Sequence, residues 1–176
     1  MKPHRWGLVL LSLLAACGPR KPGPTNHGRV EGAVGFAFGT TQGEELSSET
    51  TRGRATALIF VTTYDPVCQA QATELDKAVR SHTPRSNAGA VVMEAPKYAF
   101  LAEVWRTELG LSYPVAMANP STLGRSGPFG SLRRVPTLVV LDRSGREVWR
   151  REGFVALATI LHQLSEASKS GDPRGY

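Results

Sequence analysis

The sequence predicts an α/β domain in which a central mixed sheet has helices on both faces, and three apolar runs carry this prediction. Residues 58–61 and 90–93 are short runs that contain β-branched side chains, and each is followed by a stretch with helical periodicity. Residues 138–141 form the third run, and a turn leads from it to a returning strand at residues 147–149. Strands that are joined through helices run parallel and strands that are joined by a tight turn run antiparallel, so the sheet contains both directions.

The length and the composition fit one domain of ordinary size. The chain has 176 residues, of which 41% are hydrophobic, and this is enough for a proper core. The formal net charge is +6. Lys2 and Arg5 lie in a segment that we expect to be removed, which leaves 19 basic side chains (21 minus 2) against 15 acidic ones, a net charge of +4. Because this excess is small and dispersed, no nucleic-acid partner is predicted.

Residues 1–16 have the features of a secretory signal peptide. A basic start precedes an apolar run at residues 8–14, which is far shorter than the roughly 20 residues that a helix needs to span a bilayer. The sequence LAAC, which ends at Cys17, resembles the lipobox of bacterial lipoproteins, in which the cysteine becomes the lipid-modified first residue. The resemblance implies attachment of Cys17 to membrane lipid and a place in the bacterial cell envelope, facing the periplasm or the exterior. A plain signal peptide is the alternative.

The mature chain is predicted to have three parts. Residues 17–35 are rich in Gly, Pro and basic residues and lack an apolar period, which is typical of a flexible tether. Residues 36–168 form the domain, which opens with a hairpin around Gln42-Gly43. Residues 169–176 are expected to form a disordered tail.

The first apolar run leads into a helix start that contains Cys68, the one cysteine expected to keep its thiol. Asp65 can accept a hydrogen bond from a backbone amide of the first turn, and Pro66 at the first helical position loses only a donor that had no partner. Cys68 is then the third helical residue, where the peptide dipoles favour a thiolate. The carboxylate of Asp65 opposes this effect.

This stretch resembles the active-site strand, loop and helix of thioredoxin-fold proteins, in particular the membrane-tethered TlpA-like thiol-disulfide oxidoreductases, in which an apolar strand runs into Trp-Cys-x-x-Cys. Tyr64 stands at the place of the Trp, Asp65 at that of the first, nucleophilic cysteine, and Cys68 at that of the second. Pro66 and Val67 occupy the two positions between them. The resemblance implies a thioredoxin-like fold with a degenerate active site, because half of the dithiol is missing.

A second landmark is the VPT sequence at Val135 and Pro136. It resembles the cis-proline loop of the same fold, which packs against the active-site cysteines and offers backbone groups to an extended substrate. The resemblance implies that these two residues bind a partner together with Tyr64, Asp65 and Pro66. A trans proline that opens a strand is the alternative.

Apolar periodicity predicts the helices. The helix after the turn is expected to bury Ala70, Ala72, Leu75, Ala78 and Val79. Residues 98–109 predict an amphipathic helix whose apolar face contains Phe100, Leu101, Val104, Trp105 and Leu109. Residues 154–164 form the closing helix.

Three functions remain open. The first is a thiol-disulfide oxidoreductase that uses Cys68 alone and forms a mixed disulfide or a sulfenic acid, which an external thiol resolves. The second is a redox-inactive module that binds a protein or a peptide, with Asp65 as a helix cap and Cys68 as a small buried hydrophobe. The third is a one-cysteine peroxidase, but Val61 and Asp65 stand where the Pro and the Thr of the peroxiredoxin motif Pro-x-x-x-Thr-x-x-Cys belong.

The partners that these functions imply are an envelope protein thiol or a peptide, in addition to the membrane lipid at Cys17. No cofactor is predicted. His82 and His162 stand singly on helical stretches, so no metal site is predicted either.

Overall fold

The computed structural model describes residues 32–171 of the chain. The predicted signal peptide, the lipid attachment at Cys17, most of the tether and the last residues of the tail lie outside the described residues. No helix within residues 32–171 is long and apolar enough to cross a membrane.

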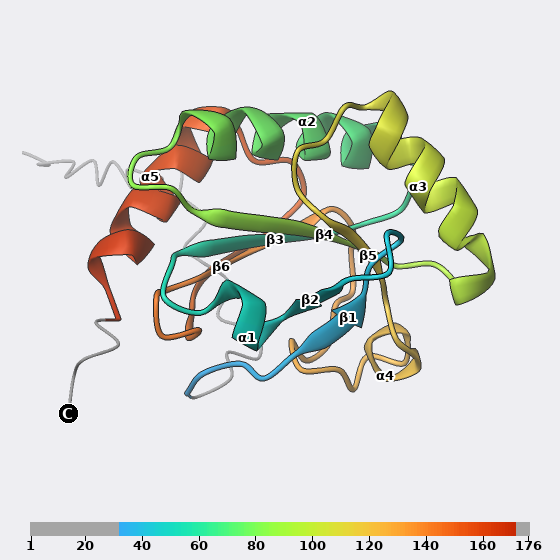
Figure 1. Ribbon diagram of the computed structural model, residues 1–176, viewed down its shortest axis with the longest axis horizontal. Helices are drawn as coiled ribbons and strands as arrows, with labels where there is room; N and C mark the ends of the chain where they lie inside the picture. The colour runs from blue at the N-terminus through green and yellow to red at the C-terminus, as the bar shows by residue number, and fades with distance from the viewer. Residues whose placement is uncertain (1–31, 172–176) are drawn as a thin grey trace, which may run out of the picture.

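The domain is built on a five-stranded mixed sheet in the order β5-β4-β3-β6-β7 (Figure 1). The strands are β3 (Thr56–Val61), β4 (Asn87–Val92), β5 (Val115–Met117), β6 (Thr137–Leu141) and β7 (Glu147–Glu152). The pairs β3–β4 and β4–β5 are parallel, whereas β6 runs antiparallel to both of its neighbours. β3 is the central strand and all six of its residues are buried, which confirms the prediction from its continuous apolar run.

Two layers cover the sheet (Figure 1). The longer helices, α2 (Pro66–Ser81), α3 (Ala99–Glu108) and α5 (Leu157–Lys169), lie toward one face, and the one-turn η1 (Pro96–Tyr98) leads into α3. The other face carries the hairpin of β1 (Ala37–Gly39) and β2 (Glu45–Ser47) with the short helices α1 (Ser48–Thr51) and α4 (Pro120–Leu123). The predicted arrangement of a mixed sheet between helices and an N-terminal hairpin is therefore confirmed.

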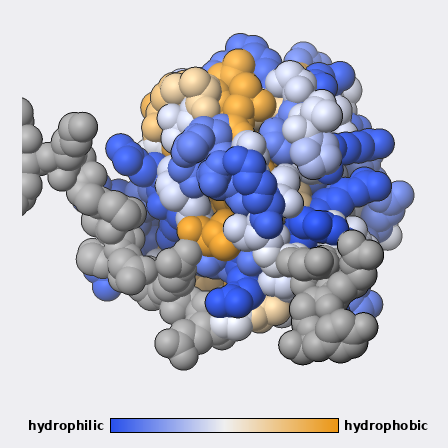
Figure 2. All heavy atoms as spheres, turned by 90° about the vertical axis from the view of Figure 1, so that its left-hand side faces the viewer, coloured by the Kyte–Doolittle hydropathy of each residue, from blue (hydrophilic) through white to orange (hydrophobic). Residues whose placement is uncertain are grey.

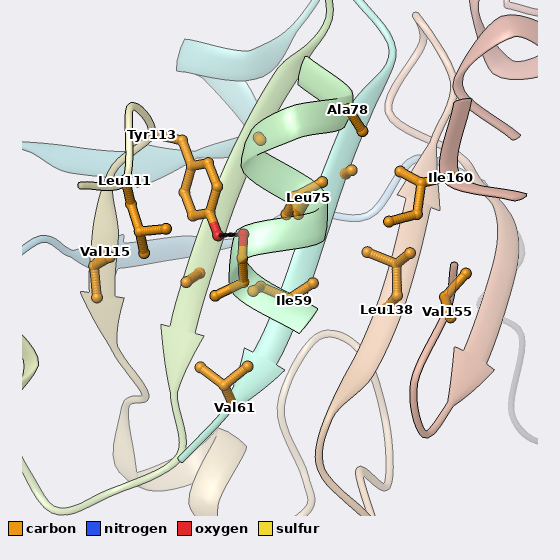
Figure 3. Packing of buried hydrophobic residues seen from close by; sticks show 14 of the residues in the cluster. Ile59, Val61, Leu75, Ala78, Leu111, Tyr113, Val115, Leu138, Val155 and Ile160 are labelled. Carbon is orange, nitrogen blue, oxygen red and sulfur yellow. Dashed lines mark hydrogen bonds between the residues drawn. The ribbon is translucent and has the colours of Figure 1, made fainter. Parts of the chain in front are cut away.

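The alternation of side chains along β3 divides the core into two clusters. Ile59 packs with Leu75 of α2, Leu138 of β6 and Ile160 of α5 on the side of the long helices (Figure 3). Phe60 points to the other side, where its ring centroid lies 5.2 Å from that of Phe129. A strand with both faces in a core is held rigidly, so the turn that follows it starts from a fixed point.

The domain begins earlier than the sequence predicts. Val34, which we placed in the tether, is buried, and its amide donates a hydrogen bond to the carbonyl of Gly145 at 2.8 Å. Ala33 forms an isolated bridge with Arg146, at the start of β7. At the other end, α5 begins at Leu157 in place of residue 154, and it extends beyond the predicted end at residue 164 to Lys169, one residue past the predicted domain. The sequence did not predict the short paired segment at Ala33, because a single β-bridge needs no periodic pattern of apolar residues and the surrounding composition is rich in Gly.

The predicted apolar face of the helix at residues 98–109 is confirmed for Trp105 and Leu109 and wrong for its other three residues. Phe100, Leu101 and Val104 are exposed, with relative accessibilities of 77%, 49% and 41%. Ala102 and Trp105 are the residues of α3 that enter the core. The periodicity identified the apolar side chains correctly, but α3 lies at one end of the sheet beside the three-residue β5, so only one side of the predicted face, with Trp105, meets the core.

Candidate functional site at the thiol edge

One edge of the sheet brings together the two landmarks that are far apart in the sequence. β3, β4 and β7 end at this edge, because β3 is parallel to β4 and both β3 and β7 are antiparallel to β6. β6 begins there, and its first residue, Thr137, pairs with Phe60 near the end of β3. We use the name thiol edge for this end of the strands, because Cys68 follows β3 there and Pro136 precedes β6. Ligands of α/β proteins commonly bind at the carboxyl ends of parallel strands.

The helix start at the thiol edge forms as predicted. An oxygen of the Asp65 carboxylate, Oδ1, accepts a hydrogen bond from the amide of Val67 at 2.8 Å, and the backbone of Asp65 is extended (φ −90°, ψ 119°). Pro66 is the first helical residue. Asp65 is therefore the N-cap of α2, and the position that holds a nucleophilic cysteine in the family that the sequence resembles holds a capping carboxylate here.

The thiol of Cys68 is buried inside this turn. The residue has 0% relative accessibility and belongs to the core cluster on the helix side of the sheet. Its sulfur accepts a hydrogen bond from the amide of Thr62 at 3.5 Å, and the hydroxyl of Thr62 lies 4.0 Å away. Burial raises the pKa of the Cys68 thiol, the amide of Thr62 lowers it, and the carboxylate of Asp65 raises it further, with a net upward shift. The thiol is therefore protonated near neutral pH, because burial outweighs the dipoles of the helix start.

A carboxylate that we did not predict holds the loop between β3 and α2. Glu94, which follows β4, accepts hydrogen bonds through Oε1 from the amide of Thr63 at 2.6 Å and from its hydroxyl at 2.8 Å. The amide group of the Gln69 side chain donates to the carbonyl of Thr63 at 3.1 Å. The only sequence signal for Glu94 is its place after a strand parallel to β3, which brings it to the same edge.

The proline loop has the predicted cis peptide bond between Val135 and Pro136. Pro136 is buried, and its carbonyl accepts a hydrogen bond from the amide of Gly153 at 2.7 Å. Within the described residues, the amide and the carbonyl of Val135 have no hydrogen-bond partner. The loop thus presents one free amide and one free carbonyl beside the helix start.

Three exposed apolar side chains lie on the segments around this loop. Tyr64 is 76% exposed, Val67 is 46% exposed and Phe154 is 50% exposed. The first two flank Asp65 at the start of α2, and Phe154 follows the amide of Gly153 that binds Pro136. Sequence reasoning selected Tyr64 but missed Phe154, which it counted only as the start of the closing helix.

A buried amide, Gln71, ties the Phe154 segment to α2. Its Oε1 accepts from the amide of Val155 at 2.6 Å and its Nε2 donates to the carbonyl of Val155 at 3.4 Å. The sequence predicted that Ala70 would face the core, but Ala70 is exposed and Gln71 is buried. An apolar count does not detect a buried glutamine whose polar atoms are both paired.

No metal site is evident in the part of the chain that the structure describes. Within residues 32–171, no group of three or more His, Cys, Asp or Glu side chains could hold a metal ion.

Comparisons with known proteins identify the fold. No family model and no curated protein matches the chain. Solved structures do match. A thiol:disulfide interchange protein of the thioredoxin family from Chlorobium tepidum is 24% identical over 84% of this chain and 99% of its own, with a TM-score of 0.64. The exposed lipoprotein thioredoxin of Streptococcus pneumoniae is 21% identical over 75% of this chain and 98% of its own, with a TM-score of 0.62.

A thiol-disulfide isomerase from Corynebacterium glutamicum is similar to the same extent. It is 20% identical, and the match covers 83% of this chain and 99% of that one with a TM-score of 0.61. At these identities the similarity establishes the fold. The chain is a thioredoxin-fold protein, and its structural neighbours are thiol-disulfide oxidoreductases.

Proposed function

We propose that this protein is a TlpA-like lipoprotein of the bacterial cell envelope that binds a polypeptide segment at the thiol edge and performs no dithiol exchange. One observation carries the proposal: Cys68, the only thiol within the described residues, is fully buried behind a capping carboxylate, Asp65. In this proposal the degenerate site keeps a receiving surface, which consists of the Val135 backbone and the exposed side chains near it, and lacks the pair of cysteines that dithiol exchange needs.

The chemistry of the site argues against turnover. Dithiol exchange needs two thiols, so that the mixed disulfide formed by the first is resolved by the second. The attacking species is a thiolate, and burial holds the pKa of Cys68 up. Asp65 cannot form a disulfide, and its carboxylate raises the pKa of the remaining thiol further.

The receiving surface supports a binding role. The free amide and carbonyl of Val135 match the groups that an extended chain offers when it adds to a strand. Tyr64 and Val67 at the start of α2, and Phe154 after the Gly153 amide that binds Pro136, are exposed apolar side chains on the neighbouring segments. An aromatic side chain that is held by a rigid scaffold contributes much contact area at a small cost in conformational entropy. We therefore assign the partner as an extended segment with apolar side chains.

The location in the cell envelope rests on the N-terminal sequence. Lipidation of Cys17 would place the domain on a membrane, and one structural neighbour carries the description of an exposed lipoprotein. The test is fractionation of cells that express the full chain. We expect the wild type to partition into the membrane and detergent phase, and Cys17→Ser to leave it. Wild-type protein in the soluble fraction with a free Cys17 thiol would contradict the anchor.

Labelling of Cys68 tests the binding role against catalysis. We expect iodoacetamide to alkylate Cys68 of the folded full chain at pH 7.5 at least a hundredfold more slowly than in the chain unfolded in urea. Equal rates would refute the proposal that the thiol is inert. A Tyr64→p-benzoylphenylalanine variant then tests the surface itself: it should cross-link to an envelope polypeptide, whereas the same photoreactive residue at Arg85, which precedes β4 at the opposite edge, should not.

A second function, a single-cysteine oxidoreductase, is favoured by one observation. Cys68 is the third residue of α2, and the amide of Thr62 points at its sulfur from 3.5 Å, an arrangement that stabilises a thiolate. In this function the thiolate of Cys68 attacks a partner disulfide, a mixed disulfide forms and the partner's other sulfur leaves as a thiolate; an external thiolate then releases Cys68. Rapid labelling at neutral pH would favour it. A peroxidase is disfavoured, because a fully buried sulfur gives a peroxide no access.

A further inference from the structure

The outer face of η1 and α3 carries most of the large apolar side chains that the described residues expose. Tyr98, Phe100, Leu101 and Val104 are 41%, 77%, 49% and 41% exposed. The opposite face, at the left of Figure 1, is mainly hydrophilic and carries hydrophobic patches of its own (Figure 2). α3 lies at the other end of the molecule. Contiguous apolar side chains of this size commonly mark an interaction surface.

Four exposed residues of this face form one stripe along η1 and α3. Lys97, Leu101, Val104 and Glu108 follow one another at spacings of four, three and four residues, and all four are exposed. Leu101, Val104 and Glu108 lie on α3, where this spacing places side chains on one side of the helix, as in a helix–helix seam, and Lys97 precedes them in the 3-10 turn η1. We call it the α3 stripe.

The α3 stripe is complementary to itself. Leu101 and Val104 are equally far from the middle of the stripe, and so are Lys97 and Glu108. When two copies of the stripe lie antiparallel, Leu101 of each copy therefore faces Val104 of the other, and Lys97 of each copy faces Glu108 of the other. A two-fold axis requires this reciprocity: if one residue of the first copy contacts a second residue of the other copy, the same contact also occurs with the two copies exchanged.

The charges at the ends of the stripe are available for such a contact. Lys97 has no carboxylate partner within the described residues, and its ammonium lies 5.0 Å from the centre of the Tyr98 ring. Glu108 has no partner in the same part of the chain. The neighbouring charges are occupied, because Arg106 binds Glu103 at 2.7 Å and Glu103 also accepts from the hydroxyl of Thr41. Of the charges that the structure describes on α3 and η1, the two complementary ends of the stripe thus remain unpaired.

The geometry points to a second copy of this chain as the occupant of the α3 stripe, packed antiparallel across a two-fold axis through the middle of α3. A membrane surface fits less well. The described chain begins beside Arg146, at the start of β7, whereas α3 follows β4 at the thiol edge. The predicted tether therefore leaves from the opposite edge. A shared membrane raises the effective concentration of two tethered copies, which favours even a small interface.

Cross-linking in membranes from cells that express the full chain tests the contact directly. A zero-length carbodiimide should give a dimer in which mass spectrometry finds Lys97 joined to Glu108. The two residues lie too far apart along η1 and α3 to join within a copy, since eleven residues at the α-helical rise already span roughly 16 Å. In a second assay, Val104→Cys should form a dimer with a short bismaleimide, because Cys68 is buried and does not compete. Arg85→Cys at the opposite edge should not.

Charge reversal in the Val104→Cys background tests whether the partner at the α3 stripe is a second copy of the chain or another molecule. Lys97→Glu and Glu108→Lys should each lower the dimer yield at least tenfold, because like charges then face each other. The double exchange Lys97→Glu/Glu108→Lys should restore the yield to within twofold of the parent, since complementarity returns only when both copies carry both changes. Lys169→Glu, the same charge change on α5, should leave the yield unchanged.

Several outcomes would overturn the inference. One is a dimer yield that the single charge reversals do not change. Another is a double exchange that does not restore the dimer yield. The third is an adduct in which the Val104→Cys variant is joined to a different protein or to lipid in place of a second copy. None of these outcomes bears on the polypeptide surface around Val135, so failure here is distinguishable from failure of the proposed function.

Discussion

The amide of Thr62 lies 3.5 Å from the sulfur of Cys68, so the residue that follows β3 and the third residue of α2 close a small buried turn around the thiol. Its thiol is inaccessible, and the carboxylate of Asp65 caps the helix at the position that the sequence resemblance assigns to an attacking cysteine. Whether that carboxylate is a cap or a catalytic group can be measured.

Removal of the Asp65 carboxylate separates these roles. Asp65 caps α2 through the amide of Val67, so Asp65→Ala should lower the free energy of unfolding by about 0.5–2 kcal/mol, whereas Asp65→Asn should cost little. Because the carboxylate also raises the pKa of Cys68, Asp65→Asn should speed alkylation of the thiol. Melting temperature and alkylation rate are measured on the same samples. A general base would show the reverse pattern, with a stable variant that reacts more slowly.

The buried thiol should make stability fall at alkaline pH. The pKa of Cys68 is raised in the folded state, so the unfolded chain releases this proton first, at about pH 9.0. The protonated thiol therefore makes its full contribution to the free energy of unfolding below pH 9. This contribution is lost as the pH rises through the folded-state pKa, by at most about 1.4 kcal/mol for each pH unit. Urea unfolding of the wild type and of Cys68→Ala between pH 7 and pH 11 should diverge above pH 9. Parallel curves would mean that the thiol titrates normally in the folded state.

We predict that the hydrogen bonds of Gln71 to Val155 stabilise the segment that carries Phe154. Gln71→Met keeps the side-chain length but leaves the amide and the carbonyl of Val155 without their partner, so we expect a loss of about 1–3 kcal/mol in urea unfolding. Ala70→Ser on the exposed side of the same turn is the control and should change stability by less than about 0.5 kcal/mol. A Gln71→Met variant as stable as the wild type would show that the Phe154 segment does not depend on this clamp.

Restoration of the second thiol should restore redox chemistry. The wild type should reduce insulin only marginally, because it has no second thiol at the site to resolve a mixed disulfide. Asp65→Cys places a cysteine three residues before Cys68 at the start of α2, and we expect a disulfide that dithiothreitol reduces, together with measurable insulin reduction. Asp65→Ser is the control, since it keeps the cap without adding a thiol. Wild-type turnover at the rate of an ordinary thioredoxin would refute our account of the site.

The sequence by itself determined the fold and the helix start. The apolar run at residues 58–61 predicted the central strand, and Asp-Pro predicted the beginning of α2, because capping depends only on residues within one turn. The resemblance at Val135 predicted the cis bond. These features are local, so neighbouring residues in the chain contain the information for them.

The tertiary structure alone decided what the site can do. Whether Cys68 is accessible depends on the elements that pack over α2, and no local pattern contains that information. Glu94 and Gln71 became visible only when their partners, Thr63 and Val155, were brought beside them. The same reason explains why Phe100, Leu101 and Val104 of α3 are exposed against prediction: periodicity gives the position of a stripe on a helix, but burial depends on where the rest of the chain lies.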